Sequence, residues 1–250
     1  MKVSDLQIDP RLKEKIQEMG IVELYPPQRQ AVEAGLLEGK SLIVATQTAS
    51  GKTLLALLAA CRAAEQGLKT LYLSPLRALT AEKAEWFRKL LEPMGYKVAA
   101  TSRDYDSPEE WLKRVDVIVA TYEKADSLIR HRSTWLRDLG LIVIDELHNI
   151  TDPERGPRLE IAVTALTHIA PNAQRLGLSA TISNHEEFSK WLVAECIVSD
   201  WRPTPLAEAV YYDGKLYRAD GQAEDIELNT RDPSVGLVLN TILDGGQAMV

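Results

Sequence analysis

Residues 41–66, "SLIVATQTASGKTLLALLAACRAAEQ", contain in order a short apolar run, a turn and a long helix-forming segment. The apolar run at 41–46 predicts a buried strand, and the segment at 52–66 predicts a helix. The turn at 47–51 brings backbone N–H groups and the helix N-terminus into one small volume, an arrangement that binds anions. The stretch therefore predicts a phosphate-binding loop on a strand–helix unit.

The same alternation continues along the chain. Apolar runs bounded by turns predict further strands at 70–74, 97–101, 115–121, 139–146 and 174–180. Longer periodic segments predict helices at 77–92, 108–114, 122–132, 157–170 and 184–193, and a further helix at 28–37 follows a loop broken by two prolines, Pro26 and Pro27. Alternating strands and helices predict an α/β fold with a parallel β-sheet covered by helices on both faces. Ligands of such sheets bind at the carboxyl ends of the strands.

The loop "TQTASGKT" (46–53) ends like a phosphate-binding loop but begins with Thr46 where the usual pattern has glycine. Lys52 is expected to reach the β- and γ-phosphates, and the hydroxyl of Thr53 to bind magnesium. Gly51 lets the backbone approach the phosphate without a Cβ in the way. Thr46 closes the loop and is not itself a phosphate ligand, so this departure leaves the prediction intact. The loop residues expected to bind ATP are Thr48, Ala49, Ser50, Gly51, Lys52 and Thr53.

Two acidic residues end the predicted strand in "LIVIDELH" (141–148). In a parallel sheet this end lies on the same edge as the loop, so Asp145 can hold magnesium through a water molecule. Glu146 can then orient or deprotonate the attacking water. The alternative is an acidic pair that merely starts a surface loop. Together with Lys52, these residues predict a catalytic site for nucleotide hydrolysis that uses ATP and Mg²⁺.

Composition limits the other classes of function. The net charge of −7 argues against a protein that coats nucleic acid through bulk electrostatics, so local cationic patches must make any such contact. No apolar run approaches the roughly 20 residues of a membrane span, and the first residues lack the apolar core of a signal peptide, so we expect a cytoplasmic protein without a membrane partner. The two cysteines, Cys61 and Cys196, lie far apart, which argues against a disulfide framework or a zinc site.

Six motifs follow one another in a recognisable order: "LYPPQRQAV" (24–32), "ATQTASGKT" (45–53), "SPLRALTAEK" (74–83), "ATYEKADSLIR" (120–130), "DELH" (145–148) and "LSATI" (178–182). This order resembles the motor of superfamily 2 helicases. The chain is most similar to the Ski-like group, and within it to the archaeal DNA repair helicases called Hjm, relatives of the helicase part of polymerase theta. The segments "DPERGPRLE" (152–160) and "SDWRPTPLAEAVYYDGKL" (199–216) strengthen the resemblance, which covers nearly the whole chain.

The resemblance implies a RecA-like P-loop NTPase domain and roles for further residues. Gln28 would read the adenine edge, since its amide offers a donor and an acceptor, and Tyr25 would pack nearby. Ser179 and Thr181 would couple the phosphate site to nucleic acid; the alternative is a polar pair that simply ends a core strand. Residues expected to grip the backbone of a nucleic-acid strand are Pro75, Leu76, Arg77, Arg103, Thr121, Glu123 and Lys124. Arg103 stands where the family tends to have glycine, and this departure is expected to alter a nucleic-acid contact.

The expected domain organisation has four parts. Residues 1–30 form an N-terminal segment with the adenine-reading motif, and 31–200 form the first RecA-like domain. Residues 201–233 contain strands around an Asp213–Gly214 turn and then an acidic loop. Residues 234–250 are expected to form a helix, a glycine turn and the first residues of a strand that begin a second RecA-like domain. We therefore expect the chain to be the first half of a motor, with the second RecA-like and C-terminal domains missing in cis.

The implied function of the intact protein is ATP-driven 3′-to-5′ movement on single-stranded DNA, with unwinding at forks for DNA repair. Single-stranded or forked DNA is the expected partner. Two alternatives stay open. One is an RNA helicase of the same Ski-like group, and the other is a nucleotide-binding adaptor that does not translocate. The resemblance also predicts slow ATP turnover by this chain alone, because no arginine finger follows.

Overall fold

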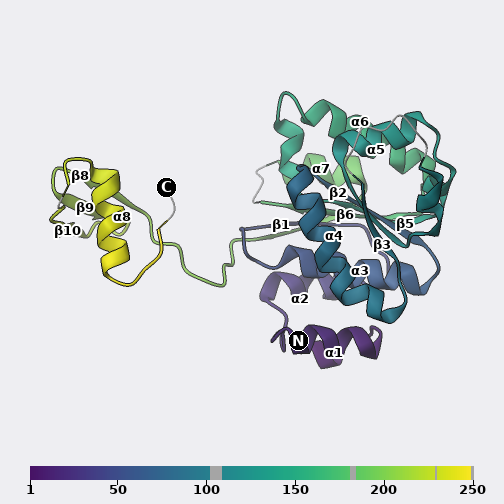
Figure 1. Cartoon of the computed structure of the whole chain (residues 1–250), viewed down its shortest axis with the longest axis horizontal. Coiled ribbons are helices and arrows are strands. Elements are labelled where there is room, and N and C mark those ends of the chain that lie inside the picture. The colour runs from purple at the N-terminus through teal and green to yellow at the C-terminus, as the bar shows by residue number, and fades with distance from the viewer. Residues whose placement is uncertain (102–108, 181–183, 229, 249–250) are drawn as a thin grey trace. The chain divides into compact units, whose positions relative to one another are not determined.

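The computed structural model describes residues 1–101, 109–180, 184–228 and 230–248 (Figure 1). The chain divides into two compact units, Met1–Pro203 and Thr204–Val250. Each unit is described by itself below. None of the described helices is long and apolar enough to cross a membrane.

The first unit is built on a seven-stranded parallel sheet with the strand order β3-β4-β2-β5-β6-β1-β7. Its strands are β1 (Leu42–Thr46), β2 (Lys69–Ser74), β3 (Val98–Thr101), β4 (Val117–Thr121), β5 (Leu139–Ile144), β6 (Gln174–Ser179) and β7 (Glu195–Ser199). β1 and β4 are buried along their whole length, and β2, β5 and β6 each contain one half-buried residue, as expected for a sheet that is covered on both faces. The predicted fold class is therefore confirmed.

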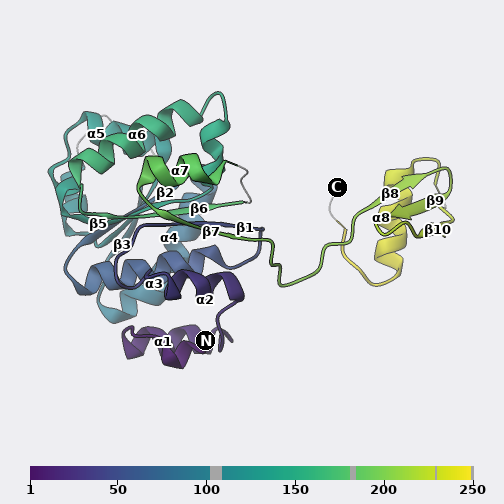
Figure 2. The same cartoon turned by 180° about the vertical axis from the view of Figure 1, so that it is seen from behind.

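Helices cover both faces of this sheet (Figures 1 and 2). On one face lie α1 (Pro10–Glu18), α2 (Pro26–Glu33), α3 (Lys52–Glu65) and α4 (Arg77–Leu91). On the other lie α5 (Tyr122–Arg130), α6 (Gly156–Ile169) and α7 (His185–Leu192). Successive strand residues contribute to opposite layers: Leu42 and Val44 join the first core, and Ile43 between them joins the second.

The predicted strands are all present, and β7 is an additional one that the sequence pattern did not indicate. Among its residues Glu195–Ser199 only Ile197 is buried, and charged or polar residues stand at both ends, so the segment lacks a long apolar run. β7 pairs in parallel with β1, and Ser199 lies opposite Thr46. It is an edge strand, which explains why only one of its residues is fully buried.

Two helix predictions were wrong in detail. The prolines start α2 at Pro26, because proline suits the first helical turn, and the helix ends at Glu33. The segment predicted as a helix at 108–114 contains only a short 3-10 helix, Glu110–Arg114, among its described residues. Five residues with an exposed Trp111 offer too little apolar surface to hold a full α-helix against the sheet.

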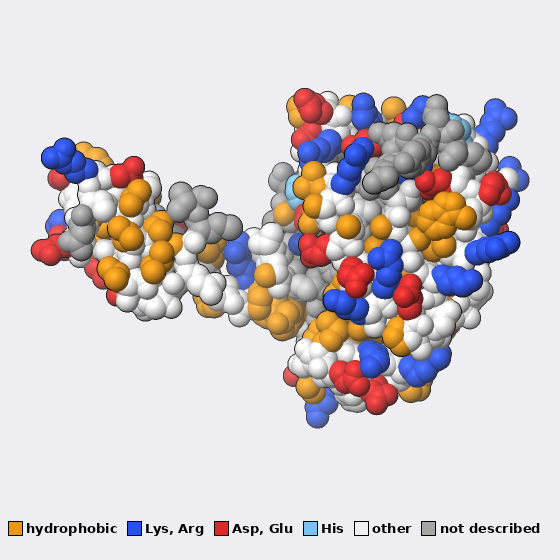
Figure 3. Space-filling model, in the orientation of Figure 1, with side chains coloured by type: hydrophobic (Ala, Val, Ile, Leu, Met, Phe, Trp, Pro, Cys, Tyr) orange, Lys and Arg blue, Asp and Glu red, His pale blue; other side chains and the backbone are white. Residues whose placement is uncertain are grey.

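The second unit contains a three-stranded antiparallel sheet and one helix among its described residues: β8 (Ala209–Tyr212), β9 (Lys215–Arg218), β10 (Ala223–Asp225) and α8 (Pro233–Leu243). Asp213 and Gly214 both have positive φ, 47° and 77°, so the predicted tight hairpin is confirmed. β10 lies in the segment predicted as a loop, and its three residues are too few to form a pattern. The turn predicted after the helix is present at Asp244 and Gly245, and the strand predicted for the last three residues lies mostly outside the described residues. Exposed apolar side chains gather over α8 (Figure 3).

Candidate functional site

The loop between β1 and α3 has the geometry of an anion-binding loop. Gly51 lies just before α3 with φ of 73°, and a Cβ there would stand 2.3 Å from Nε2 of Gln28. Only glycine fits this position without strain. Thr46 and Ser50 share a hydrogen bond of 2.6 Å between their hydroxyls. Thr46 therefore ties the two ends of the loop together from inside the protein, in agreement with the closing role expected for it.

Lys52 folds back over this loop. Its Nζ donates to the carbonyl of Thr46 at 2.7 Å and to that of Gln47 at 3.3 Å. Partial burial lowers the pKa of Lys52, and nearby Lys83 adds to this effect, whereas Glu146 and Asp145 oppose it. An anion in the loop would replace the two carbonyls as partner of the ammonium group.

The acidic pair follows β5 at the same edge of the sheet. Asp145 is 6% exposed, and its Oδ2 accepts a hydrogen bond of 2.6 Å from the hydroxyl of Tyr72 on β2. Its Oδ1 accepts from the backbone N–H of Glu146 at 3.1 Å. The hydroxyl of Tyr122 donates to the carbonyl of Asp145. Burial raises the pKa of Tyr72, so its hydroxyl keeps the proton that it donates to Asp145.

The loop and the acidic pair line one cavity of about 330 Å³, which also includes Leu79 and Lys83. Thr53 and Asp145, the two expected magnesium ligands, both face it. Among the described residues no three His, Cys, Asp or Glu side chains cluster as a metal site. A hydroxyl and one carboxylate suit Mg²⁺ when phosphate oxygens and water complete its shell, so the residues present fit the ion. Nζ of Lys83 donates to Oγ1 of Thr53 at 2.9 Å, which places a cationic group on the hydroxyl expected to bind magnesium.

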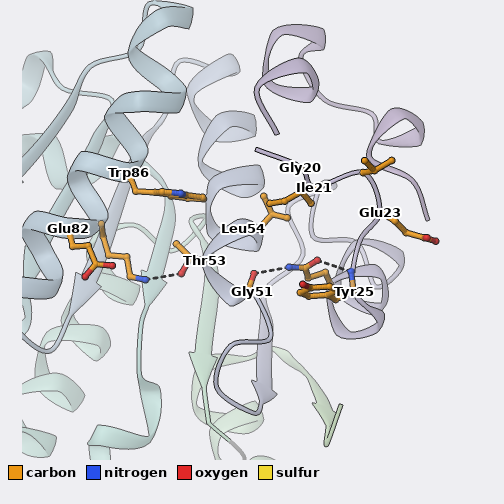
Figure 4. Close-up of a pocket in the computed structure, with 12 residues that line it drawn as sticks. Gly20, Ile21, Glu23, Tyr25, Gly51, Thr53, Leu54, Glu82 and Trp86 are labelled. Atoms are coloured by element: carbon orange, nitrogen blue, oxygen red, sulfur yellow. Dashed lines mark hydrogen bonds between the residues drawn. The ribbon is translucent and has the colours of Figure 1, made fainter. Parts of the chain in front are cut away.

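A second pocket of about 490 Å³ adjoins the first across Gly51, Thr53 and Lys83 (Figure 4). Its apolar wall includes Ile21, Leu54 and Trp86, and Tyr25 lies at one end. Gln28 also lines this pocket. Such a mostly apolar hollow beside an anion site suits the base of a nucleotide.

Gln28 joins this second pocket to the loop. Its Oε1 accepts from the backbone N–H of Tyr25 at 2.8 Å, and its Nε2 donates to the carbonyl of Gly51 at 2.9 Å. The amide thus keeps one N–H and one lone pair for a ligand. Its predicted role in reading adenine stays a prediction.

Comparison with known proteins identifies the family. Residues 25–188 match the family model described as DEAD/DEAH box helicase. The chain belongs to the DEAD/DEAH box helicase family. It is 47% identical over its whole length to a protein of Thermococcus kodakarensis named ATP-dependent DNA helicase Hel308, covering 22% of that protein. It is 48% identical over 90% of its length to a Pyrococcus abyssi protein of the same name, covering 31% of it.

The chain thus spans between a fifth and a third of the length of these helicase relatives. Among solved structures, the DNA-bound crystal structure of the DUF1998 helicase MrfA is similar with a TM-score of 0.67 and 26% identity, over 77% of this chain and 29% of MrfA. MrfA without DNA gives the same TM-score at 27% identity. The RecA-like helicase fold is therefore shown for the first unit.

The predicted nucleic-acid residues of this helicase domain do not all lie at the surface. Leu76 and Arg77 are exposed where β2 passes into α4, and Glu123 is half-buried at the start of α5. On the face drawn in Figure 3, cationic and acidic side chains are interspersed. Pro75 is buried, and Arg103 lies outside the described residues.

The side chains of Lys124 and Thr121 form contacts inside the protein. Lys124 is completely buried, and its Nζ forms an ion pair with Oε1 of Glu109 at 3.2 Å. The hydroxyl of Thr121 accepts from the backbone N–H of Lys124 and so begins α5. The ammonium of Lys124 is thus paired inside the protein, where a buried charge needs a partner. The predicted nucleic-acid contact of Lys124 stays a prediction.

Ser179 lies close to the acidic pair through His148. The Nδ1 atom of His148 is 3.4 Å from Oγ of Ser179 and 3.5 Å from Oε2 of Glu146. The backbone N–H of Ala180 also donates to this nitrogen at 3.4 Å. His148 therefore lies between Ser179 on β6 and Glu146. The coupling role predicted for Ser179 stays a prediction. Thr181 lies outside the described residues.

The sequence analysis did not identify Tyr72, Lys83 or Trp86 as site residues. Lys83 and Trp86 are three positions apart on α4 and so share one face of it. The spacing could have shown that they act together. That this face points toward the phosphate loop depends on how α4 packs beside α3, which the spacing does not encode.

Replacement of Tyr72 by phenylalanine is expected to weaken nucleotide binding only when magnesium is present. The ring would still fill the core, but Oδ2 of Asp145 would lose its donor, at about 1 kcal/mol or roughly fivefold in affinity. Titration with an ATP analogue, with Mg²⁺ and with a chelator, measures both cases. A Tyr212→Phe variant, exposed in the second unit, is the matched control. An equal loss with and without Mg²⁺ would contradict the role of Tyr72 in positioning Asp145.

Proposed function

We propose that this chain is the first motor domain of an ATP-dependent DNA helicase and that it binds Mg-ATP and single-stranded DNA. The observation that carries the proposal is the shared cavity. Lys52 and Thr53 from the loop after β1 meet Asp145 and Glu146 after β5 around one space of about 330 Å³. That space lies at the carboxyl edge of a parallel sheet, where α/β proteins bind their ligands.

Each residue has a distinct part in the proposed hydrolysis. Lys52 would bind the β- and γ-phosphates. The hydroxyl of Thr53, and the carboxylate of Asp145 through a water molecule, would hold magnesium. The bound ion would neutralise charge that develops on the transferred phosphoryl group. Glu146 orients the attacking water or takes its proton. Gln28 and Tyr25 contact the adenine in the adjoining pocket.

The names of the relatives support DNA as the nucleic acid. The similar proteins of Thermococcus kodakarensis and Pyrococcus abyssi are named as DNA helicases, and a structure of MrfA contains DNA. The exposed Leu76 and Arg77 support a backbone contact at the start of α4. Movement in the 3′-to-5′ direction and a role in fork repair rest on the resemblance of the motifs alone.

Two further functions remain in competition with this one. An RNA helicase of the same group would share the nucleotide site, and competition between DNA and RNA oligomers of one sequence separates the two, because a DNA enzyme does not need the 2′-hydroxyl. A nucleotide-binding adaptor would bind ATP without any response to nucleic acid.

ATP turnover by this chain, with and without single-stranded DNA, tests the proposal. The relatives extend far beyond the matched region, and we propose that the second half of their motor, with its arginine finger, lies there. We therefore expect ATP binding with little turnover, since such an arginine contributes on the order of a thousandfold. Binding that is strongly weakened in a Lys52→Ala variant supports the assigned site. Brisk DNA-stimulated turnover by the chain alone would contradict the half-motor, and absence of any ATP binding would contradict the proposed function as a whole.

A further inference from the structure

The end of the first unit lies beside the start of the phosphate loop. β7 and β1 are parallel neighbours, and Ser199 is the register partner of Thr46. The chain segments that follow these two residues therefore leave the sheet side by side. One segment is the loop at 47–51, and the other is 200–203, which ends at the boundary between the two units.

Arg202 connects these two segments directly. Its Nη2 donates to Oε1 of Gln47 at 2.7 Å, and both side chains are partly buried. Gln47 is the first residue of the loop, and its carbonyl also accepts from Lys52. The loop begins at Gln47 and ends at Gly51. Arg202 thus contacts its first residue.

Trp201 makes a second connection, on the side of the base pocket. Its ring packs against that of Tyr25 with a centroid separation of 4.6 Å and an interplanar angle of 42°. Tyr25 lines the 490 Å³ pocket. The backbone N–H of Tyr25 donates to Gln28, which in turn donates to Gly51. A continuous series of contacts therefore runs from Trp201 through Tyr25 and Gln28 to the other end of the loop.

We propose that Trp201 and Arg202 are positioning residues of the nucleotide site, and that this site thereby includes the segment where the chain leaves the first unit. Trp201 fixes the ring of Tyr25 for a purine base, and Arg202 fixes Gln47 for the phosphates. This inference rests on the proposed function, since it assumes a nucleotide in the two adjoining pockets.

The two residues act on different parts of the ligand, which provides a sharp test. Loss of the Trp201 ring frees the ring of Tyr25, but it leaves the Gln47 contact and the hydrogen bond from the backbone N–H of Tyr25 to Gln28. It should therefore affect only ligands that carry a base. Loss of the Arg202 guanidinium changes the loop itself, so it should affect every ligand with a phosphate chain. If this segment has only a structural role, each variant should lower the affinities for both classes of ligand equally or leave both unchanged.

The experiment is a calorimetric titration of the 250-residue chain with an ATP analogue and, separately, with inorganic tripolyphosphate. We expect Trp201→Ala to lower the affinity for the ATP analogue by about three- to tenfold, while the affinity for tripolyphosphate stays unchanged. Trp201→Phe should restore most of the loss, because it keeps an aromatic ring against Tyr25. Arg202→Gln should lower the affinities for both ligands by a similar factor of about three to ten.

Trp191→Phe is the matched control, because Trp191 is a half-buried tryptophan on α7 that bonds to Thr164, away from both pockets. Unchanged tripolyphosphate binding by Trp201→Ala also shows that this variant is folded. If Trp201→Ala binds both ligands like the unaltered chain, or loses both equally, the assignment of Trp201 is overturned. If the unaltered chain binds neither ligand, the proposed function fails and the inference fails with it.

Hydrogen exchange provides a second readout that does not depend on a variant. Nucleotide binding should slow amide exchange in the peptide that covers 199–203, because the two contacts to the site tighten with it. Exchange of this peptide that is the same with and without saturating nucleotide would contradict the proposed connection, even if the affinities of the variants change.

Discussion

Alanine in place of Lys52 is expected to weaken nucleotide binding by about 100-fold, on the order of 2.7 kcal/mol, because a charge-assisted contact to phosphate is lost. In the structure Nζ of Lys52 lies over the loop and donates to the carbonyls of Thr46 and Gln47, two neutral acceptors that an entering anion would replace. The affinity of the chain for an ATP analogue, measured by calorimetry, tests this expectation. Lys89→Ala, at an exposed lysine on α4, is the control and should change nothing. If the substitution lowers the affinity by less than about threefold, Lys52 does not bind the phosphates.

The same residue predicts a pH dependence. Only the protonated ammonium attracts phosphate, and burial lowers the pKa of Lys52 from that of an ordinary lysine. As the pH rises through this lowered pKa, the protonated fraction of the free protein falls, and the affinity for nucleotide should fall with it. A titration from about pH 7 to about pH 10 at constant ionic strength measures this. Affinity that stays constant until the range of an ordinary lysine would show that the loop does not depress the pKa.

Alanine in place of Gly156 is expected to destabilise the first unit by about 3 kcal/mol, through overpacking against backbone. A Cβ on Gly156 would stand 2.1 Å from the carbonyl oxygen of Ile150 and 2.8 Å from its carbon. Backbone cannot move aside as the end of a side chain can, so either α6 or the 3-10 helix Leu147–Thr151 must shift. The melting temperature should fall by roughly 6–12 °C for a protein of this size.

Thermal unfolding followed by circular dichroism measures the effect of the Gly156 substitution. Glu160→Ala, at an exposed position in the same helix, is the control and should stay within about 0.5 kcal/mol. Because the 3-10 helix follows Glu146 directly, the Gly156 variant should also bind nucleotide less well. A melting temperature within about 2 °C of the unaltered chain would mean that the contact relaxes at little cost.

Much of the architecture could be predicted because it depends on local pattern. Short apolar runs separated by amphipathic helices are sufficient to indicate a parallel sheet covered on both faces. Since the carboxyl ends of parallel strands share one edge, the loop at 46–53 and the acids Asp145 and Glu146 could be placed together without coordinates. The role of Thr46 in closing the loop followed from its place as the first position of the loop pattern.

Tertiary structure alone decided which further side chains complete the site. The Tyr72–Asp145 hydrogen bond, the approach of Lys83 to Thr53, and the burial of Lys124 against Glu109 join residues whose spacing in the chain carries no periodic signal. These contacts depend on the order of strands in the sheet and on which face of each helix packs inward. The periodicity of apolar residues shows that a strand is buried, but it does not show which strands and helices lie next to it.

The edge of the sheet illustrates the same division. The motif "SDWRPTPL" could be recognised from the sequence as part of a resemblance, but its position could not. The segment Glu195–Ser199 forms β7, which pairs with β1 at the edge of the sheet. Its mostly half-buried or exposed residues gave no sequence signal for this pairing. This pairing brings Trp201 and Arg202 to Tyr25 and Gln47, more than 150 residues earlier in the chain. Local sequence determined the elements and their chemistry; long-range strand pairing determined which of them touch, because its free energy comes from surfaces that exist only after the chain has folded.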